Sequence, residues 1–259
     1  MNKIQSIQPA KGDQVIVTIQ TSSGTIPHVS TMHLVLKYHL EEGMRLKEDD
    51  YKTFLKDNEY ELLYQKAILF ISHQMRTVSE VKKKLRQTTK DESLIDRIVQ
   101  ELKQHNYLGD IQYVKEYVTE KLTYDLVGPI HIKDKLVQKG VHFDVIDGEL
   151  IRYSEDIESA KVEELLMREL KYPIKKPYLK FLDSFKRKCV TKGFHLHVVG
   201  SIVSRFQDDI LDQIDEDHLI QVELSRYQEE PSTYEEKQKR MEALRRKGFS
   251  YRVIQKYMS

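Results

Sequence analysis

A short phrase that occurs three times constrains the fold of this chain more than any other feature. In each copy a lysine and a glycine precede an apolar residue and a histidine or serine, and an apolar pair closes the phrase. The copies occupy residues 139–146, 192–199 and 247–254, and their glycines are 53 and then 55 positions apart. Self-similarity at a nearly fixed period indicates a tandem-repeat architecture.

The phrase predicts a helix, a turn and a second helix. A lysine in the last helical turn, followed by a glycine that can adopt the left-handed conformation, is typical of a helix end. The histidine or serine stands where the next helix begins, and the apolar pair supplies the buried side of that helix. We therefore expect Gly140, Gly193 and Gly248 each to separate two helices.

Composition favours several small cores. The 259 residues are 39% hydrophobic and 32% charged, which is too apolar for a disordered chain and too charged for one thick core. The single cysteine, Cys189, excludes an intramolecular disulfide and a cysteine-based zinc cluster. There is no signal peptide and no long apolar run, so we expect a cytoplasmic protein that does not associate with membranes.

The N-terminal residues differ from the rest. Residues 15–19 form a β-prone run, and a Ser-Ser-Gly turn at 22–24 precedes a second extended stretch at 25–27. We predict a small β-hairpin followed by helices at 30–41 and 47–55. The hairpin either caps the helical array or offers a contact surface, and the cap is favoured because the end units of repeat arrays are usually atypical.

From residue 59 onward, apolar residues at helical spacing predict four sets of three helices. Capping boxes are predicted at 77–80, 89–92 and 232–235. The acidic segment 207–217 is either a linker or a short helix that closes the third set. The predicted fold is mainly α, with tandem three-helix, helix-turn-helix-like repeats in an elongated array. The predicted domains are an N-terminal β-hairpin plus helices at 1–58, three-helix repeats at 59–108, 109–153 and 154–207, and an acidic linker with a fourth repeat at 208–259.

Motifs of the common enzyme classes are absent from the sequence. There is no glycine-rich phosphate loop, no H-E-x-x-H and no G-x-S-x-G, so we expect no enzymatic activity, cofactor or metal. Cys189 lies near His195 and His197, but it continues an apolar helical stripe and is expected to pack in a core. The acidic clusters 48–50 and 215–217 could bind a divalent ion, but solvated helix starts are the better interpretation.

Charge is strongly segregated although the net charge is only +1. Between residues 171 and 192 there are eight basic residues and one acid, whereas 207–217 has six acids and no base. The middle helix of each set carries most of the bases. A solvated face explains one such helix, but recurrence in four sets, with aromatic residues interleaved in the third, favours a surface for phosphates or an acidic protein. The candidate contact residues are Lys82, Lys83, Lys84, Arg86, Lys175, Lys176, Lys180, Lys186, Arg187 and Lys188.

Three short helices with a tight turn also describe helix-turn-helix DNA readers. Base reading needs Asn, Gln, Arg or Ser at the start of the third helix. These starts, at 142–144, 195–197 and 250–252, read His-Phe-Asp, His-Leu-His and Ser-Tyr-Arg, so two of the three are poorly suited. A stand-alone DNA-binding or transcriptional module is therefore the alternative, and a metal-dependent hydrolase is a third hypothesis without residues to support it.

Several short motifs together resemble the RecX family of bacterial recombination regulators. They are Ala67-Ile68, Ser79-Glu80, Lys84-Leu85, Tyr107-Leu108 with Asp110 and Tyr113, Gly128-Pro129 with Ile132 and Leu136, and Lys139-Gly140-Val141. The resemblance is specific over residues 61–151 and depends on the internal repeat beyond them. Two positions depart from the family pattern: Asn106 stands where glycine is usual, and Gly109 where an acidic residue or asparagine is common.

The resemblance implies a non-enzymatic, monomeric regulator of DNA recombination and repair. Such a protein lies along the groove of the RecA–DNA filament and restrains the ATPase, strand-exchange and coprotease activities of RecA. Weak electrostatic contacts to single- or double-stranded DNA are also implied. A row of small helical units suits this role, because each unit can contact a successive subunit and the contacts reinforce one another.

Overall fold

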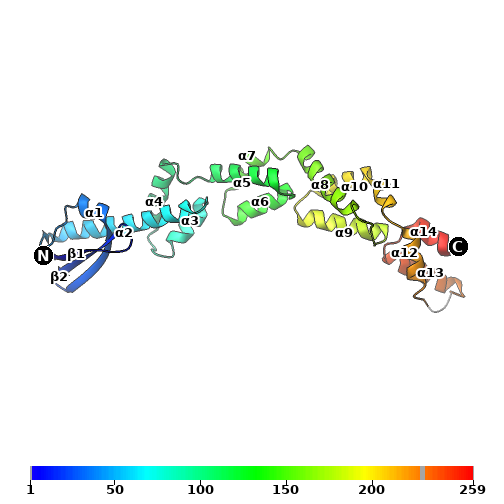
Figure 1. The fold of residues 1–259 in the computed structure, drawn as a ribbon, viewed down its shortest axis with the longest axis horizontal. Coiled ribbons are helices and arrows are strands. Elements are labelled where there is room, and N and C mark those ends of the chain that lie inside the picture. The colour runs from blue at the N-terminus through cyan, green and yellow to red at the C-terminus, as the bar shows by residue number, and fades with distance from the viewer. Residues whose placement is uncertain (1, 228–230, 259) are drawn as a thin grey trace. The chain divides into compact units, whose positions relative to one another are not determined.

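The computed structural model describes residues 2–227 and 231–258, which are mainly helical with a small antiparallel sheet near the N-terminus (Figure 1). The mainly helical fold class predicted from the sequence is confirmed. The chain forms two compact units. One comprises the residues up to Tyr113 together with 139–141, and the other comprises 114–138 and the residues from 142 onward.

The N-terminal strands form a four-stranded sheet of order β3-β2-β1-β4, which is larger than the predicted hairpin. The strands are β1 Asn2–Pro9, β2 Gln14–Thr21, β3 Gly24–Thr31 and β4 Arg45–Leu46. The predicted hairpin corresponds to β2 and β3, which pair antiparallel along their length. In β1 mostly polar residues surround the buried Ile4, so its sequence lacks the apolar alternation that marks a strand.

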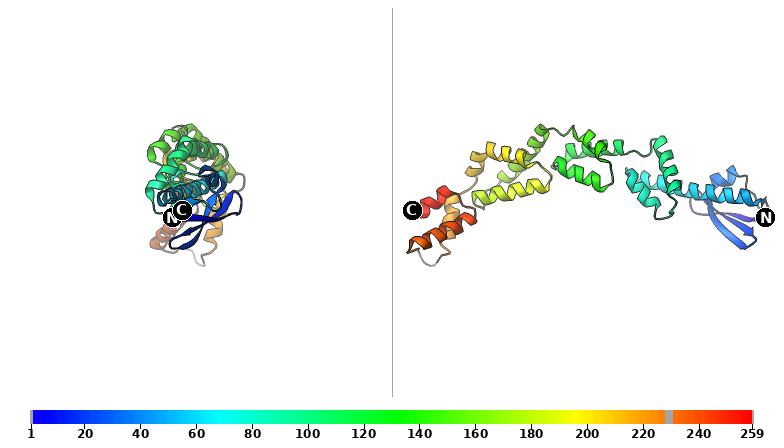
Figure 2. Two further views of the ribbon diagram at one scale, coloured as in Figure 1. Left: turned by 90° about the vertical axis from the view of Figure 1, so that its left-hand side faces the viewer. Right: turned by 180° about the vertical axis from the view of Figure 1, so that it is seen from behind.

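One long helix connects the sheet to the first helical core. After the short α1, Met32–Lys37, the helix α2, Glu48–Ser72, runs without interruption (Figures 1 and 2). Its Phe54 is buried against the sheet, whereas its Ala67 belongs to the following core. The helix predicted at 47–55 and the helix predicted from 59 are therefore one helix, and its two halves bury different faces.

The remaining helices follow in chain order. They are α3 Val78–Leu85, α4 Glu92–Gln104, α5 Asp110–Tyr124, α6 Pro129–Gln138, α7 Phe143–Leu150, α8 Glu155–Leu170, α9 Tyr178–Thr191, α10 Leu196–Arg205, α11 Gln207–Asp212, α12 Glu216–Leu224, α13 Tyr234–Arg246 and α14 Tyr251–Met258. Separate apolar cores are formed by α2–α4, by α8–α11 and by α12–α14. In the acidic segment, the short-helix alternative holds for α11, because Ile210 is fully buried in the core of α8–α10.

Helix starts follow the predicted chemistry at one of the three capping boxes. The box at Thr77 and Glu80 is confirmed, with both reciprocal hydrogen bonds present. The prediction at 89–92 is wrong, because Asp91 is the N-cap of α4 and accepts from the Leu94 N–H. The prediction at 232–235 is wrong by one residue, because Thr233 and Glu236 form the box at the start of α13.

The three glycines of the repeated phrase adopt the left-handed conformation, as predicted. The φ angles of Gly140, Gly193 and Gly248 are 77°, 82° and 92°. Asn106, which replaces a glycine of the family pattern, also has a positive φ of 57° and ends α4 in the same way. Asparagine tolerates this conformation better than other residues with a side chain, which explains the substitution.

Each of these glycine turns packs against the start of an earlier helix. The Gly193 carbonyl accepts from the Ile130 N–H at 3.1 Å, and the Gly248 carbonyl accepts from the Leu179 N–H at 3.1 Å. Both contacts use amides that the first turn of a helix leaves unpaired. We call the two contacts the Gly193 joint and the Gly248 joint. In the first unit, Gly140 packs similarly against Ser79, the second residue of α3.

Candidate partner-binding surface

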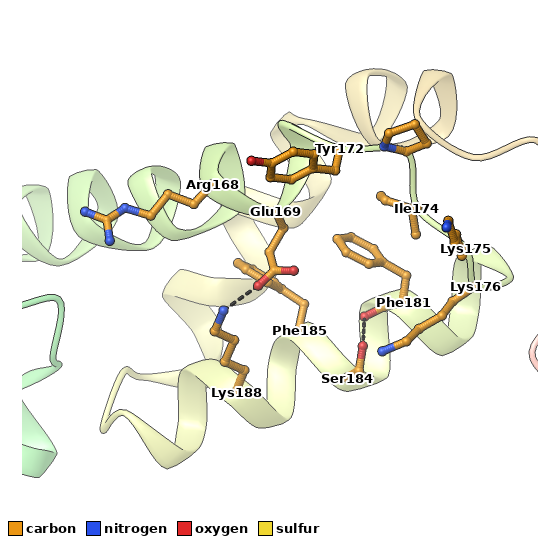
Figure 3. A pocket seen from close by; sticks show the side chains of 11 residues that line it. Arg168, Glu169, Tyr172, Ile174, Lys175, Lys176, Phe181, Ser184, Phe185 and Lys188 are labelled. Atoms are coloured by element: carbon orange, nitrogen blue, oxygen red, sulfur yellow. Dashed lines mark hydrogen bonds and ion pairs between the residues drawn. The ribbon is translucent and has the colours of Figure 1, made fainter.

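A cleft of about 450 Å³ lies between the end of α8, the loop that follows it and α9 (Figure 3). The loop runs from 171 to 177, and Pro177 precedes the first residue of α9. Proline at this place ends the loop without loss, because its missing N–H is one that a helix start leaves unpaired. The cleft brings three of the candidate residues together, namely Lys175, Lys176 and Lys188.

Aromatic residues have two different roles in this cleft. Phe181 and Phe185 stack on each other with ring centroids 6.1 Å apart and are buried in the core of α8–α11. They form the floor of the cleft and cannot stack on a base. Tyr172, by contrast, is 74% exposed at the rim, where Figure 3 shows its ring above Glu169 and Phe181. Of the interleaved aromatic residues named here, only Tyr172 is available to a partner.

The cations around the cleft divide into paired and unpaired groups. Lys188 forms an ion pair with Glu169, and Arg187 forms one with Asp183 at 2.7 Å. In both pairs an acidic side chain of the protein itself neutralises the cation. Lys175, Lys176 and Lys180 are exposed and make no ion pair with any residue of 2–227 or 231–258, and neither does the half-buried Lys186. These four lysines are the candidate residues near the cleft whose positive charge is not paired within the described residues.

The second cluster of candidates lies on and directly after α3, in the other unit. Lys82 pairs with Asp96 at 2.5 Å, and Arg86 donates two hydrogen bonds to Glu92 at 2.7 and 2.9 Å. The Arg86 hydrogen bonds hold the pKa of Glu92 below its ordinary value. Because Lys82 and Arg86 already have acidic partners within the protein, they are weak candidates for contacts with a binding partner.

The two remaining residues of that cluster differ from each other. Lys84 lies over the Phe70 ring, with its Nζ 5.7 Å from the ring centroid. Lys83 is exposed, and no ion pair links it to another described residue. Lys83 is therefore the most accessible cation of the α3 cluster.

The basic residues of the fourth set were noted in the sequence, but the candidate contact residues chosen from it do not include them. Lys239, Arg245 and Arg246 on α13 and Arg252 on α14 are exposed and form no ion pair within the described parts of the chain. The acids of α13 stand in its first turn and its arginines in its last, an arrangement that favours the helix dipole. This distribution of charge along α13 could have identified Arg245 and Arg246 as candidates, because it places them far from the acids of the first turn.

Cys189 and the acidic cluster 215–217 behave as structural elements, whereas the cluster 48–50 is an exposed helix start, as predicted. Cys189 is fully buried, and burial raises the pKa of its thiol to about 11, so the thiol stays protonated at neutral pH. Asp215 caps α12, but Glu216 is buried and accepts from the Tyr178 and Ser250 N–H groups, so it is not a solvated helix start. Within 2–227 and 231–258 no group of three His, Cys, Asp or Glu side chains could hold a metal ion.

Comparison with known proteins identifies the family. The model described as "RecX, first three-helix domain" matches residues 64–102, and the model described as "RecX, third three-helix domain" matches residues 220–258. The "Regulatory protein RecX" of Oceanobacillus iheyensis is 29% identical over 229 residues, which cover 87% of this chain and 84% of the relative. The chain belongs to the RecX family.

Other RecX proteins agree with this assignment. The "Regulatory protein RecX" of a serotype V strain of Streptococcus agalactiae is 29% identical over 86% of this chain and 87% of its own length. A crystal structure of regulatory protein RecX matches with a TM-score of 0.61 and 22% identity over 79% of this chain and all of that chain. The crystal structure of RecX from Lactobacillus salivarius matches with a TM-score of 0.55 and 25% identity over 58% of this chain and 98% of that one.

The matched segments contain the elements described above. The 64–102 match covers the C-terminal part of α2 from residue 64, with α3 and most of α4, and the 220–258 match covers part of α12 with α13 and α14. The second match therefore includes the unpaired Arg245, Arg246 and Arg252. In the described parts of this RecX chain, every helix is too short or too polar to cross a bilayer.

Proposed function

We propose that this RecX chain binds the RecA–DNA filament and inhibits the ATPase, strand-exchange and coprotease activities of RecA during recombination and repair. It acts as a cytoplasmic monomer without catalysis of its own. Its membership of the RecX family supports this role, as does the tandem order of its small helical cores. The observation that carries the proposal is the group of unpaired lysines at the α8–α9 cleft, because unpaired surface cations attract an acidic or phosphate-bearing partner.

The unpaired lysines favour an extended, charged partner over a small molecule. Lys175 and Lys176 stand at the mouth of an open cleft, and Lys180 and Lys186 follow on α9. Contacts of this kind lose strength as salt rises, because counterions compete for the same charges. The proposal therefore implies that filament binding weakens steeply between low and physiological ionic strength.

The alternative function, a stand-alone helix-turn-helix DNA reader, has less support. The first residues of α7, α10 and α14 are Phe143, Leu196 and Tyr251, and all three are exposed. Phe143 and Leu196 have no hydrogen-bonding group in their side chains, and the single hydroxyl of Tyr251 cannot form the paired hydrogen bonds that read base edges. Protection of one defined duplex sequence by the chain alone would favour this alternative.

The test is ATP hydrolysis by the cognate RecA on single-stranded DNA while the chain is added at sub-stoichiometric amounts. We expect a dose-dependent fall in hydrolysis. The double variant Lys175→Glu/Lys176→Glu should require about tenfold more protein for the same inhibition, since several charge contacts to the partner are reversed. The control Lys52→Glu/Lys56→Glu changes the charge by the same amount on the exposed face of α2 and should inhibit as the wild type does.

Two outcomes of this test would contradict the proposal. No inhibition by the wild-type chain, together with intact DNA binding by the chain alone, would favour the DNA-reading alternative. Equal inhibition by the wild type and by Lys175→Glu/Lys176→Glu would remove the α8–α9 cleft from the contact surface.

A further inference from the structure

Exposed apolar residues recur at one position in three successive sets of helices. Phe143, Leu196 and Tyr251 are the first residues of α7, α10 and α14, and they are 52%, 59% and 66% exposed. Single exposed apolar residues are ordinary on protein surfaces. Their recurrence directly after each glycine turn indicates a common role, because these side chains neither fill the cores nor cap the helices.

A second exposed apolar residue stands at each joint of the second unit. Ile130 donates its N–H to the Gly193 carbonyl, and Leu179 donates its N–H to the Gly248 carbonyl. Ile130 is 43% exposed and Leu179 is 44% exposed. Because the two hydrogen bonds are equivalent, Ile130 has the same place at the Gly193 joint as Leu179 has at the Gly248 joint.

At the Gly248 joint these residues line a groove. Leu179 and Tyr251 border a concavity of about 550 Å³, and Met241, Phe249 and Ile254 also line it. Phe249 and Ile254 are buried, so they form a fixed apolar floor. We call this concavity the α9–α14 groove.

Exposed cations lie at the α9–α14 groove and directly beside its lining residues in the chain. Arg245 lines it, Lys180 follows Leu179 and Arg252 follows Tyr251. All three cations are exposed and make no ion pair with a described residue. Glu242 is the one acid among the lining residues. An apolar floor with Arg245 in its lining, and with Lys180 and Arg252 next to lining residues, complements an apolar side chain that has carboxylates beside it.

We propose that the α9–α14 groove binds an apolar side chain flanked by carboxylates on a protein partner, and that Ile130 and Leu196 bind the same element of a neighbouring copy. A tyrosine and an arginine around a buried apolar floor are typical of the residues that dominate protein interfaces. A position that recurs along one chain suits a partner that presents one element repeatedly, as the subunits of a filament do.

This inference depends on the proposed function for the identity of the partner, the RecA filament. A chain with two weak sites binds the filament more tightly than a chain with one, because after the first site binds a subunit the second site meets the next subunit at a high effective concentration. The apolar contacts are also distinct from the lysines at the α8–α9 cleft, since salt does not screen them. Filament binding should therefore keep a salt-resistant part.

The test compares full-length variants for equilibrium binding to RecA filaments assembled on single-stranded DNA. Leu179→Ser/Tyr251→Ser removes the exposed apolar wall of the groove, and we expect binding to weaken about tenfold or more. The control Tyr234→Ser removes the first residue of α13, which is more exposed than Tyr251 and does not line the groove, and it should change binding less than about twofold. Unchanged circular dichroism would show that both variants fold.

Charge variants and a second joint complete the test. Arg245→Glu should weaken filament binding, whereas Lys239→Glu, also on α13 but outside the groove, should not. Adding Ile130→Ser/Leu196→Ser to Leu179→Ser/Tyr251→Ser should reduce binding further than either pair does. If the combined variant loses no more filament affinity than each pair of substitutions alone, the repeated-site proposal is wrong.

Other outcomes assign the groove elsewhere. If Leu179→Ser/Tyr251→Ser binds filaments as the wild type does but loses affinity for free single-stranded DNA, the groove binds nucleic acid and the inference is wrong. If the variant instead loses a dimer detected by sedimentation, the occupant is a second copy of the chain and the inference is again wrong. A wild-type chain that binds no filament at all would refute the proposed function itself.

Discussion

The Gly193 joint predicts a large effect for a small substitution. Gly193 has a φ of 82°, and a Cβ atom added there would lie 2.2 Å from the His131 backbone nitrogen. Gly193→Ala therefore requires the turn to move away from the start of α6. That movement breaks the hydrogen bonds from the Ile130 N–H to the Gly193 carbonyl, at 3.1 Å, and from the Gly128 N–H to the Lys192 carbonyl, at 2.8 Å.

The expected destabilisation of Gly193→Ala is about 3 to 4 kcal/mol. An alanine held in the left-handed conformation costs about 1 to 2 kcal/mol. Loss of two backbone hydrogen bonds adds about 1 kcal/mol for each bond. The matched control is Gly200→Ala in α10, where the added Cβ would meet nothing within 4 Å. This control should stabilise the protein by about 0.5 to 1 kcal/mol, because alanine is the better helix former.

Urea unfolding and amide hydrogen exchange measure this effect at two levels. Unfolding followed by circular dichroism should show a lower free energy of unfolding for Gly193→Ala and a slightly higher one for Gly200→Ala. Exchange should show faster loss of the Gly128 and Ile130 amide protons, while the α9 amides keep their protection. A Gly193→Ala protein with wild-type stability and a protected Ile130 amide would refute the account of the joint.

Two further predictions concern ionisable groups. Lys37 and Tyr38 donate hydrogen bonds to Asp57 and lower the pKa of its carboxyl, so the contribution of this group is present above about pH 4 and is lost as pH falls through the lowered pKa. Asp57→Asn should cost about 1 kcal/mol at pH 7 and nothing near pH 2 in urea unfolding, and an equal cost at both values would contradict this linkage. Cys189, whose pKa is about 11, should react with a thiol reagent at pH 8 only in denaturant, and rapid reaction of the native protein would show that it is accessible.

The sequence predicted those features that a residue imposes locally. Gly140, Gly193 and Gly248 each follow a lysine and precede an apolar residue, a pattern that predicts a helix end with a positive φ, and all three have a positive φ. The surface onto which each turn packs could not be predicted, because spacing along the chain does not show which earlier helix start is near. Contacts such as that of Gly193 with His131 depend on how the repeats fold back on each other.

Elements with two environments were predicted less well. α2 was predicted as separate helices because its halves bury different faces, with Phe54 against the sheet and Ala67 in the next core. No proline or glycine interrupts residues 48–72, and that absence was the better signal. β1 was missed because only Ile4 is buried among its apolar residues and polar residues dominate the rest of the strand.

The candidate site shows why charge clusters alone identify a surface poorly. The pair of Arg187 with Asp183 is visible in the sequence, since the two residues are four apart on α9. The pairs of Lys82 with Asp96 and of Lys188 with Glu169 join different helices and could not be predicted. Pairing removes these cations from the list of strong contacts, whereas Lys175 and Lys176 lie on a loop and make no ion pair with a described residue.

The glycine turn connects the fold of the chain to its proposed binding. The same backbone hydrogen bond that holds the Gly248 turn at the start of α9 also brings Leu179 and Tyr251 to one groove. The proposed apolar binding position is therefore formed where a glycine turn packs against the start of an earlier helix, and not by the helices of a single set. It follows that opening the Gly193 joint should disturb the binding position of Ile130 and Leu196 while leaving the α9–α14 groove intact. Gly193→Ala should then lower filament affinity without changing the effect of a second change at Tyr251.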